Sequence, residues 1–257
     1  MPSCTTDGDH VASEEPLEIR VNGQPVAVVM RSPGADRQLG AGFMMTEGII
    51  DGPDDIRAIA HCTDPNRMNR DNVLLIQLEP GYDRQRLDRA RRTLYTSSSC
   101  GICGKTSLEN VFLHCPPRTT LPHISMHVLH SLEDRVRMKQ TGFGRTGGLH
   151  AAAQCAPDGQ ILSVYEDVGR HNAVDKLVGA ALMSPTERRT DTWLWISGRA
   201  SFEVVQKAHL GGFACVVAVG APTSLAVDLS KAANLGLVGF CRDGRANIYS
   251  GIVAPEK

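Results

Sequence analysis

The chain has 257 residues, with 27 Lys and Arg against 28 Asp and Glu, 42% hydrophobic residues and 5% aromatic residues. This composition is typical of an ordinary globular protein that can bury a core without disulfides or metal ions. The net charge of −1 argues against a general nucleic-acid-binding surface, and the low aromatic content argues against a base-stacking platform.

The sequence also predicts the compartment. The longest apolar run, residues 213–219, is far shorter than the roughly 20 residues that a membrane-spanning helix needs. The polar, acidic start lacks the charged and then apolar pattern of a signal peptide. We therefore expect a cytoplasmic protein without membrane contact, whose eight cysteines are mostly reduced.

The N-terminal part is predicted to be small and to contain β-structure. Residues 1–16 have the composition of a flexible tail, and residues 17–95 are predicted to form the β-containing N-terminal part. Strands are expected at 17–21 and 25–30, joined by Asn22-Gly23, which is a strong hairpin signal. A helix at 36–47, a strand at 72–78 and a helix at 83–92 follow.

Residues 96–257 are predicted to form an α/β core with a cysteine-containing loop at its start. A helix is expected at 125–140, and then strands alternate with helices. The expected strands are 161–165, 193–196, 213–219, 237–240 and 246–249, and the expected helices are 173–182, 200–210 and 225–235. This alternation predicts a largely parallel sheet with helices on both faces.

Cys100-Gly-Ile-Cys103-Gly-Lys105 is the sharpest chemical feature of the sequence. A nearby lysine and a helix that begins near Thr106 would lower a thiol pKa and favour the reactive thiolate. The spacing permits disulfide exchange, metal ligation or storage of a persulfide sulfur, and a merely structural pair stays open. A zinc site normally needs four ligands, and only the adjacent His114 and Cys115 follow nearby, so no metal site is predicted.

A glycine-rich segment, residues 142–147, matches the pattern G-x-G-x-x-G. The preceding residues are charged and helical, whereas a dinucleotide fingerprint needs an apolar strand there. We therefore interpret the segment as a turn that brings Thr146 and His150 towards a site.

Three polar turns follow predicted strands, at 166–176, 197–201 and 220–224. Arg170 and His171 are candidates for ligand contact, whereas Asn172 is expected to cap the next helix, with Asp175 in its first turn. Ser201 fits a helix cap and an anion contact equally well. Turns at the carboxyl ends of parallel strands meet in one crevice, which makes a nucleotide-like ligand plausible.

Residues 96–105, Thr-Ser-Ser-Ser-Cys-Gly-Ile-Cys-Gly-Lys, resemble the FdhD family of formate dehydrogenase accessory sulfurtransferases. Further segments resemble the same family in the same order, over about Glu18 to Ser250. They are 42–43, 46–50, 146–151, 166–176, 197–203 and 239–245. Each motif alone is weak, but their joint order is specific.

The resemblance implies a three-layer α/β/α core like that of cytidine deaminases, in a homodimer. The deaminase zinc chemistry is not expected, because the chain contains no His-x-Glu. The implied activity is that of a sulfurtransferase. It accepts persulfide sulfur from a cysteine desulfurase and passes it to the molybdenum bis(guanine dinucleotide) cofactor that formate dehydrogenase requires.

The resemblance also implies the site residues. Cys100 is then the persulfide cysteine and Cys103 its partner, and the cofactor is contacted by Phe240, Cys241, Arg242, Asp243, Gly244 and Arg245. Cys241 is expected to contribute at most its backbone. Two alternatives stay open: a non-enzymatic chaperone that binds the molybdenum cofactor, and a structural zinc module.

Overall fold

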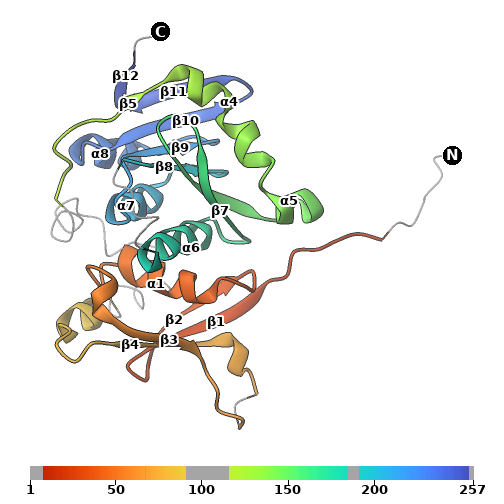
Figure 1. The fold of residues 1–257 in the computed structure, drawn as a ribbon, viewed down its shortest axis with the longest axis vertical. Helices are drawn as coiled ribbons and strands as arrows, with labels where there is room; N and C mark the ends of the chain where they lie inside the picture. The colour runs from red at the N-terminus through yellow and green to blue at the C-terminus, as the bar shows by residue number, and fades with distance from the viewer. Residues whose placement is uncertain (1–7, 67, 91–115, 185–190, 255–257) are drawn as a thin grey trace.

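The computed structural model describes residues 8–66, 68–90, 116–184 and 191–254. A four-stranded sheet with one covering helix lies at one end of the molecule, and a larger sheet with helices on both faces lies at the other (Figure 1). Cys100 and Cys103 lie outside the described residues.

The N-terminal sheet has the strand order β2-β1-β4-β3. Its strands are β1 (Glu15–Val21), β2 (Gln24–Arg31), β3 (Ile56–His61) and β4 (Val73–Leu78), with short 3-10 helices η1 (Pro53–Asp55) and η2 (Arg70–Asn72). The predicted hairpin is confirmed, because β1 and β2 pair antiparallel around Asn22 and Gly23, whose φ angles are 49° and 81°. Two consecutive positive φ angles are what a type I′ turn requires.

Helix α1 (Asp36–Thr46) covers one face of this sheet, as the sequence predicts. Leu39, Phe43 and Met44 of α1 pack on Leu17 and Ile19 of β1. A further helical turn at residues 84–90 packs Leu87 and Ala90 against the same cluster. The N-terminal part therefore has its own apolar core.

The large sheet has the strand order β11-β10-β9-β8-β6-β7. Its strands are β6 (His150–Cys155), β7 (Ile161–Asp167), β8 (Trp193–Ile196), β9 (Cys215–Ala218), β10 (Gly236–Arg242) and β11 (Arg245–Ser250), and β5 (His123–Ile124) pairs separately with β12 (Ile252–Val253).

The prediction of a largely parallel sheet is wrong. Only β8, β9 and β10 pair in parallel, whereas β6, β7 and β11 pair antiparallel with their neighbours. The reason is the length of the connections. Residues 156–160 join β6 to β7, and Asp243-Gly244 joins β10 to β11, and such short connections allow only antiparallel pairing.

Helices cover both faces of the large sheet. Helices α6 (Arg170–Met183), α7 (Phe202–Leu210) and α8 (Ser224–Ala232) pack on one face, and α4 (Met126–Arg137) packs on the other. Leu194 faces the first group, while Trp193 and Trp195 face α4, as the alternation along a strand requires. The predicted α/β layering is present. The likeness to cytidine deaminases stays a prediction.

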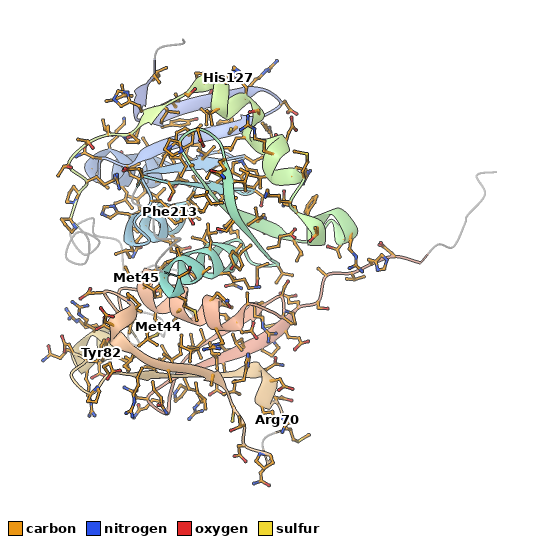
Figure 2. All side chains as sticks on the ribbon, in the orientation of Figure 1. Met44, Met45, Arg70, Tyr82, His127 and Phe213 are labelled. Atoms are coloured by element: carbon orange, nitrogen blue, oxygen red, sulfur yellow. The ribbon has the colours of Figure 1, made fainter. Side chains whose placement is uncertain are left out.

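The two parts meet through α1 and α6 (Figure 1). A Cβ on Gly42 of α1 would overlap the carbonyl oxygen of Asp175, and one on Gly179 of α6 would overlap that of Gln38. Only glycine permits this close helix crossing. Met45, labelled in Figure 2, packs against the apolar clusters of both parts. Within the described ranges, no helix is long and apolar enough to cross a bilayer.

Candidate functional site

The carboxyl ends of the three parallel strands carry loops that lie side by side. The Gly220 amide donates to the Gly198 carbonyl at 3.0 Å, and the Phe240 amide donates to the Gly220 carbonyl at 3.1 Å. The loops after β8, β9 and β10 are thereby joined in one row. We call residues 197–201, 220–223 and 240–245, together with His150, Arg170 and His171, the strand-end site.

Glycines bring the backbones of this row into close contact. A Cβ on Gly220 would lie 3.0 Å from the Gly198 oxygen and 3.1 Å from the Arg199 Cα atom. A Cβ on Gly198 would lie 3.5 Å from Arg170 Cδ and 3.8 Å from His150 Nδ1. These glycines leave room for the polar side chains that converge on the row.

His150 begins β6 and reaches the loop after β8. Its Nδ1 atom lies 3.3 Å from the Ser197 hydroxyl, which also accepts a hydrogen bond from the Ala151 amide at 3.0 Å. Burial lowers the pKa of His150, and the nearby Arg170 cation adds to this effect, whereas Asp167 opposes it. His150 therefore lies beside Ser197 and near Arg170, whereas the Thr146 hydroxyl donates to the carbonyl of Gly142 within its own segment.

His171 lies in the first turn of α6, 3.2 Å from a carboxylate oxygen of Glu203 on α7. Burial lowers its pKa to about 4, with further contributions from the cations of Lys207 and Arg170. The Glu203 side chain is half exposed, so solvent screens its charge and burial prevails. His171 is therefore a neutral imidazole near pH 7, which can accept or donate a hydrogen bond.

Three polar atoms at the site are buried and make no hydrogen bond among the described residues: Arg170 Nε, His171 Nε2 and Ser201 Oγ. Ser201 occupies the N-cap position of α7, but its side chain does not cap the helix. Buried polar atoms are normally hydrogen-bonded, so such atoms in one place are typical of a ligand site. A guanidinium and a hydroxyl suit an anionic oxygen, such as that of a phosphate.

Two predictions about the turn before α6 are wrong. Asn172 does not cap the helix, because Gly169 is the N-cap residue and the Asn172 amide donates to the carbonyl of Met30 at 2.6 Å. Asp175 lies beyond the first turn and is buried against Lys207. Both side chains bond distant segments, which a local pattern does not reveal.

The glycine-rich segment forms a short helix, α5 (Thr141–Thr146), rather than a turn. The Glu166 carboxylate accepts hydrogen bonds from the Gly142 amide at 2.8 Å and the Phe143 amide at 2.7 Å. Glu166 therefore caps α5 and fixes the segment that leads to His150.

The predicted cofactor-contacting residues 240–245 form the end of β10, a turn and the start of β11. Phe240 has a positive φ of 54° and a relative exposure of 37%. Arg242, Asp243, Gly244 and Arg245 are exposed. The Cys241 side chain is buried and its thiol donates to the carbonyl of Leu129, so only its backbone can contribute to a surface contact.

The described cysteines are all free thiols and all buried: Cys62, Cys155, Cys215 and Cys241. Burial raises the pKa of Cys155 and of Cys241 to about 12, and it raises the pKa of Cys215 as well. Cys155, Cys215 and Cys241 are therefore neutral and poorly nucleophilic near pH 7. Among the same described residues, no group of three or more His, Cys, Asp or Glu side chains suits a metal ion.

A family model described as the FdhD/NarQ family matches residues 12–254. The chain belongs to the FdhD/NarQ family. The sulfur carrier protein FdhD of Streptomyces avermitilis is 45% identical over 256 residues, which covers 97% of this chain and 90% of that protein. The sulfur carrier protein FdhD of Mycobacterium tuberculosis is 43% identical over 252 residues, which covers 95% of this chain and 91% of that protein.

One solved structure shares the fold of this family member. It is the crystal structure of a protein from Desulfotalea psychrophila that is named a formate dehydrogenase accessory protein. The TM-score is 0.72 and the sequence identity is 23%, and the match covers 96% of this chain and 90% of that chain. The resemblance seen in the sequence motifs is therefore confirmed at the level of the family.

The sequence reasoning missed Glu203 and Lys207, which approach His171 from α7. Glu203 lies in the first turn of α7, two residues after Ser201. Its place directly after a predicted polar turn was the sequence signal that could have identified it.

Proposed function

We propose that this chain is a sulfurtransferase that carries sulfur as a persulfide on Cys100. A cysteine desulfurase supplies the sulfur. The acceptor is the molybdenum bis(guanine dinucleotide) cofactor that formate dehydrogenase requires. Support comes from membership of the FdhD/NarQ family and from relatives named sulfur carrier proteins. The cytidine-deaminase-like core and the homodimer belong to the same proposal.

The observation that carries the assignment to the Cys100 pair is the burial of every described cysteine. A sulfur carrier needs a thiolate that two macromolecular partners can reach. Burial also raises the pKa values of Cys155, Cys215 and Cys241, and buried thiols do not meet this need. Cys100 and Cys103 are flanked by glycines and followed by Lys105, which favours a reactive thiolate.

The first step is thiol–persulfide exchange. The Cys100 thiolate attacks the outer sulfur of the desulfurase persulfide, the sulfur–sulfur bond of the donor breaks, and the donor cysteine leaves as a thiolate. The outer sulfur is now bound to Cys100. For release, the Cys103 thiolate attacks the Cys100 sulfur, a disulfide forms and the outer sulfur leaves as hydrosulfide. A thiol reductant then restores the pair.

The strand-end site is the proposed place for the guanine dinucleotide of the acceptor. Arg170 Nε and Ser201 Oγ are buried hydrogen-bonding groups without partners in the described ranges, and Arg199, Arg242 and Arg245 are exposed on the same row of loops. Guanidinium groups bind phosphate oxygens in a bidentate geometry. Phe240 offers an exposed aromatic face for a base.

The test is peptide mass spectrometry after incubation with a cysteine desulfurase and cysteine, without reductant. We expect the mass of one added sulfur on the Cys100 peptide, removed by a thiol reductant and absent from Cys100→Ala. The control is Cys155→Ala, which removes a buried thiol and should leave loading unchanged.

An unmodified Cys100 peptide, with the desulfurase active on another acceptor, would contradict the sulfur-carrier proposal. Retained binding of guanosine diphosphate would then favour the non-enzymatic chaperone. One zinc per chain, with unfolding of Cys100→Ala, would instead favour the structural zinc module.

A further inference from the structure

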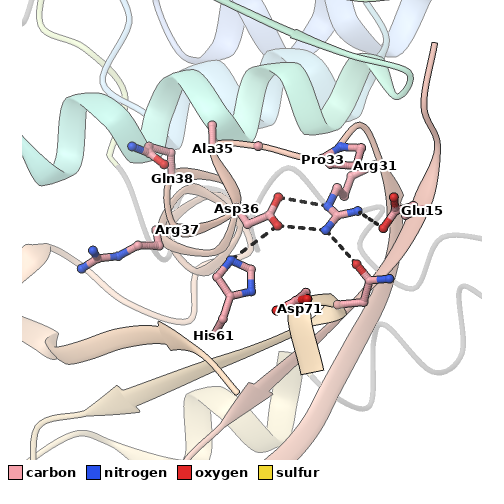
Figure 3. Close-up of a pocket in the computed structure, with 11 residues that line it drawn as sticks. Glu15, Arg31, Pro33, Ala35, Asp36, Arg37, Gln38, His61 and Asp71 are labelled. Atoms are coloured by element: carbon pink, nitrogen blue, oxygen red, sulfur yellow. Dashed lines mark hydrogen bonds and ion pairs between the residues drawn. The ribbon is translucent and has the colours of Figure 1, made fainter. Parts of the chain in front are cut away.

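A polar cavity lies in the N-terminal part (Figure 3). It opens between the start of β1, the turn from β2 to α1, the end of β3 and η2, and its volume is about 470 Å³. This volume is within the range of small-molecule sites. Nothing in the proposed sulfur transfer uses it.

Arg31 forms one wall of the cavity and is 2% exposed. Its Nε and Nη2 atoms donate to the two carboxylate oxygens of Asp36 at 3.0 and 2.9 Å, and Nη2 also donates to Asn72 at 3.0 Å. Nη1 makes no hydrogen bond within the described ranges, and the Glu15 carboxylate lies 3.5 Å from it. Nη1 therefore has a long ion pair but no hydrogen bond in these ranges, and a closer acceptor would stabilise the buried guanidinium.

His61 adds a second unused atom to the same cavity. Its Nε2 atom lies 3.6 Å from Asp36, whereas its Nδ1 atom is buried and makes no hydrogen bond among the described residues. Asp36 is already bonded by Arg31. Among the described residues, Arg31 Nη1 and His61 Nδ1 are thus two buried nitrogen atoms without a hydrogen bond, on two side chains that both contact Asp36 (Figure 3).

Carboxylates are also available in the cavity. Glu15 is 48% exposed and forms an ion pair with Arg31 at 3.5 Å, a distance too long for a hydrogen bond, and Asp71 lines the cavity as well. The lining holds the cations Arg31 and Arg37 and the carboxylates Glu15, Asp36 and Asp71. A simple anion would meet an excess of negative charge, and a simple cation would leave Arg31 Nη1 unsatisfied.

We propose that this cavity binds a free α-amino acid as its zwitterion. The carboxylate of the ligand accepts from Arg31 Nη1, and the ammonium group binds the Glu15 carboxylate, which is exposed enough to turn towards it. A zwitterion carries both charges on one small molecule, so it can bind Arg31 and Glu15 together without adding net charge to the cavity.

The test uses the full chain, labelled with ¹⁵N and titrated with the standard amino acids, beginning with glycine and L-alanine. We expect saturable shifts of the Gly34 and Gln38 amides, which line the cavity, with Kd near about 1 mM or tighter for at least one amino acid. Acetate and ethylamine, which carry one charge each, should bind at least about tenfold more weakly, a loss of about 1.4 kcal/mol.

Glu15→Gln should weaken binding about three- to fivefold, because the pair is partly exposed. The matched control is Glu14→Gln, an exposed neighbour that does not line the cavity and should leave the affinity unchanged. These variants avoid Arg31, whose loss would disturb the start of α1. The absence of any saturable shift at Gly34, equal binding of acetate, or tighter binding to Glu15→Gln would overturn the proposal.

Discussion

Phe240 combines a strained backbone with an exposed ring. Its φ of 54° costs a non-glycine residue about 1–2 kcal/mol. The conformation is held by the hydrogen bond to Gly220 and by an irregularity in the pairing of β10 with β11. Backbone strain often persists at binding positions, so this conformation agrees with the base contact proposed for Phe240.

We predict that Phe240→Asn leaves the free energy of unfolding unchanged or raises it by up to about 1 kcal/mol, because asparagine tolerates this conformation. The affinity for guanosine diphosphate should fall about five- to hundredfold with the loss of base stacking. Urea unfolding and calorimetric titration measure the two effects.

Ala35→Asn is the matched control, since Ala35 also has a φ of 54° and lies at the start of α1. It should affect stability in the same way and leave the nucleotide affinity unchanged. A strongly destabilised Phe240→Asn with normal affinity would assign the ring to the fold instead.

His171 gives the molecule a pH dependence of known sign. Its pKa is about 4 when folded, mainly because of burial, and about 6.5 when unfolded. The unfolded chain therefore binds more protons between these values, and stability that is full above pH 6.5 is lost as the pH falls towards 4.

We expect His171→Gln to reduce the loss of stability between these two pH values by about 1–3 kcal/mol. Urea unfolding at a series of pH values measures this difference. An NMR titration of the His171 ring should show a neutral imidazole at pH 7. A midpoint near 6.5 would mean that the Glu203 carboxylate offsets burial.

At the scale of elements, the crossing of α1 and α6 depends on two glycines. A Cβ on Gly42 or Gly179 would overlap a backbone carbonyl of the other helix, and neither backbone can move without separating the two parts. We predict that Gly42→Ala lowers the free energy of unfolding by about 3 kcal/mol or more.

Gly144→Ala is the control for that prediction. Gly144 lies within α5, and a Cβ there would have nothing within 4 Å. This substitution should be neutral or raise stability by up to about 1 kcal/mol, because it restricts the unfolded chain. Thermal unfolding of both variants checks the difference, and similar melting temperatures would show that α1 moves aside easily.

Local signals predicted most elements correctly. Asn22-Gly23 predicted the first hairpin, and the short apolar run at residues 193–196 predicted β8 with its observed bounds. Strand β6 was missed, because His-Ala-Ala-Ala-Gln-Cys lacks the β-branched and aromatic residues that favour strands. Its pairing partners on both sides, β7 and β8, determine its conformation.

The direction of the strands was predictable in part. Pro157-Asp158-Gly159 is a turn signal between β6 and β7, and Gly159 has a φ of 84°. It indicates a hairpin rather than a crossover. At the strand-end site, Arg170, His171 and Ser197 were identified because they follow strands. The roles of Asn172 and Asp175 depend on partners more than 100 residues away, Met30 and Thr46.

At the scale of the whole molecule, a buried polar cluster joins the N-terminal part to the core. Lys207 of α7 donates to both carboxylate oxygens of Asp175 on α6 at 2.9 Å and to the Thr46 hydroxyl of α1 at 2.8 Å. Glu47 lies 3.3 Å away. Burial lowers the pKa of Lys207, but the carboxylates of Asp175 and Glu47 outweigh it, and the net pKa is raised. Lys207 is therefore charged at neutral pH.

Removal of this single cation should weaken the junction between the two parts. We predict that Lys207→Met lowers the free energy of unfolding by about 3–5 kcal/mol, because it leaves the buried Asp175 carboxylate without a cation. Lys207→Met combined with Asp175→Asn should recover part of that loss, since the uncompensated charge is gone. Urea unfolding followed by the fluorescence of Trp193 and Trp195 reports on the core.

Hydrogen exchange of β1 reports on the N-terminal part, which contains no tryptophan. If the cluster couples the two parts, the amides of Leu17 and Ile19 should exchange faster in Lys207→Met than the core amides do, because the N-terminal sheet opens separately. Equal losses of protection in both sheets would show that the two parts still unfold together. No loss in either sheet would show that the Gly42–Gly179 crossing holds the two parts without the cluster. The single and double variants would then have the same stability.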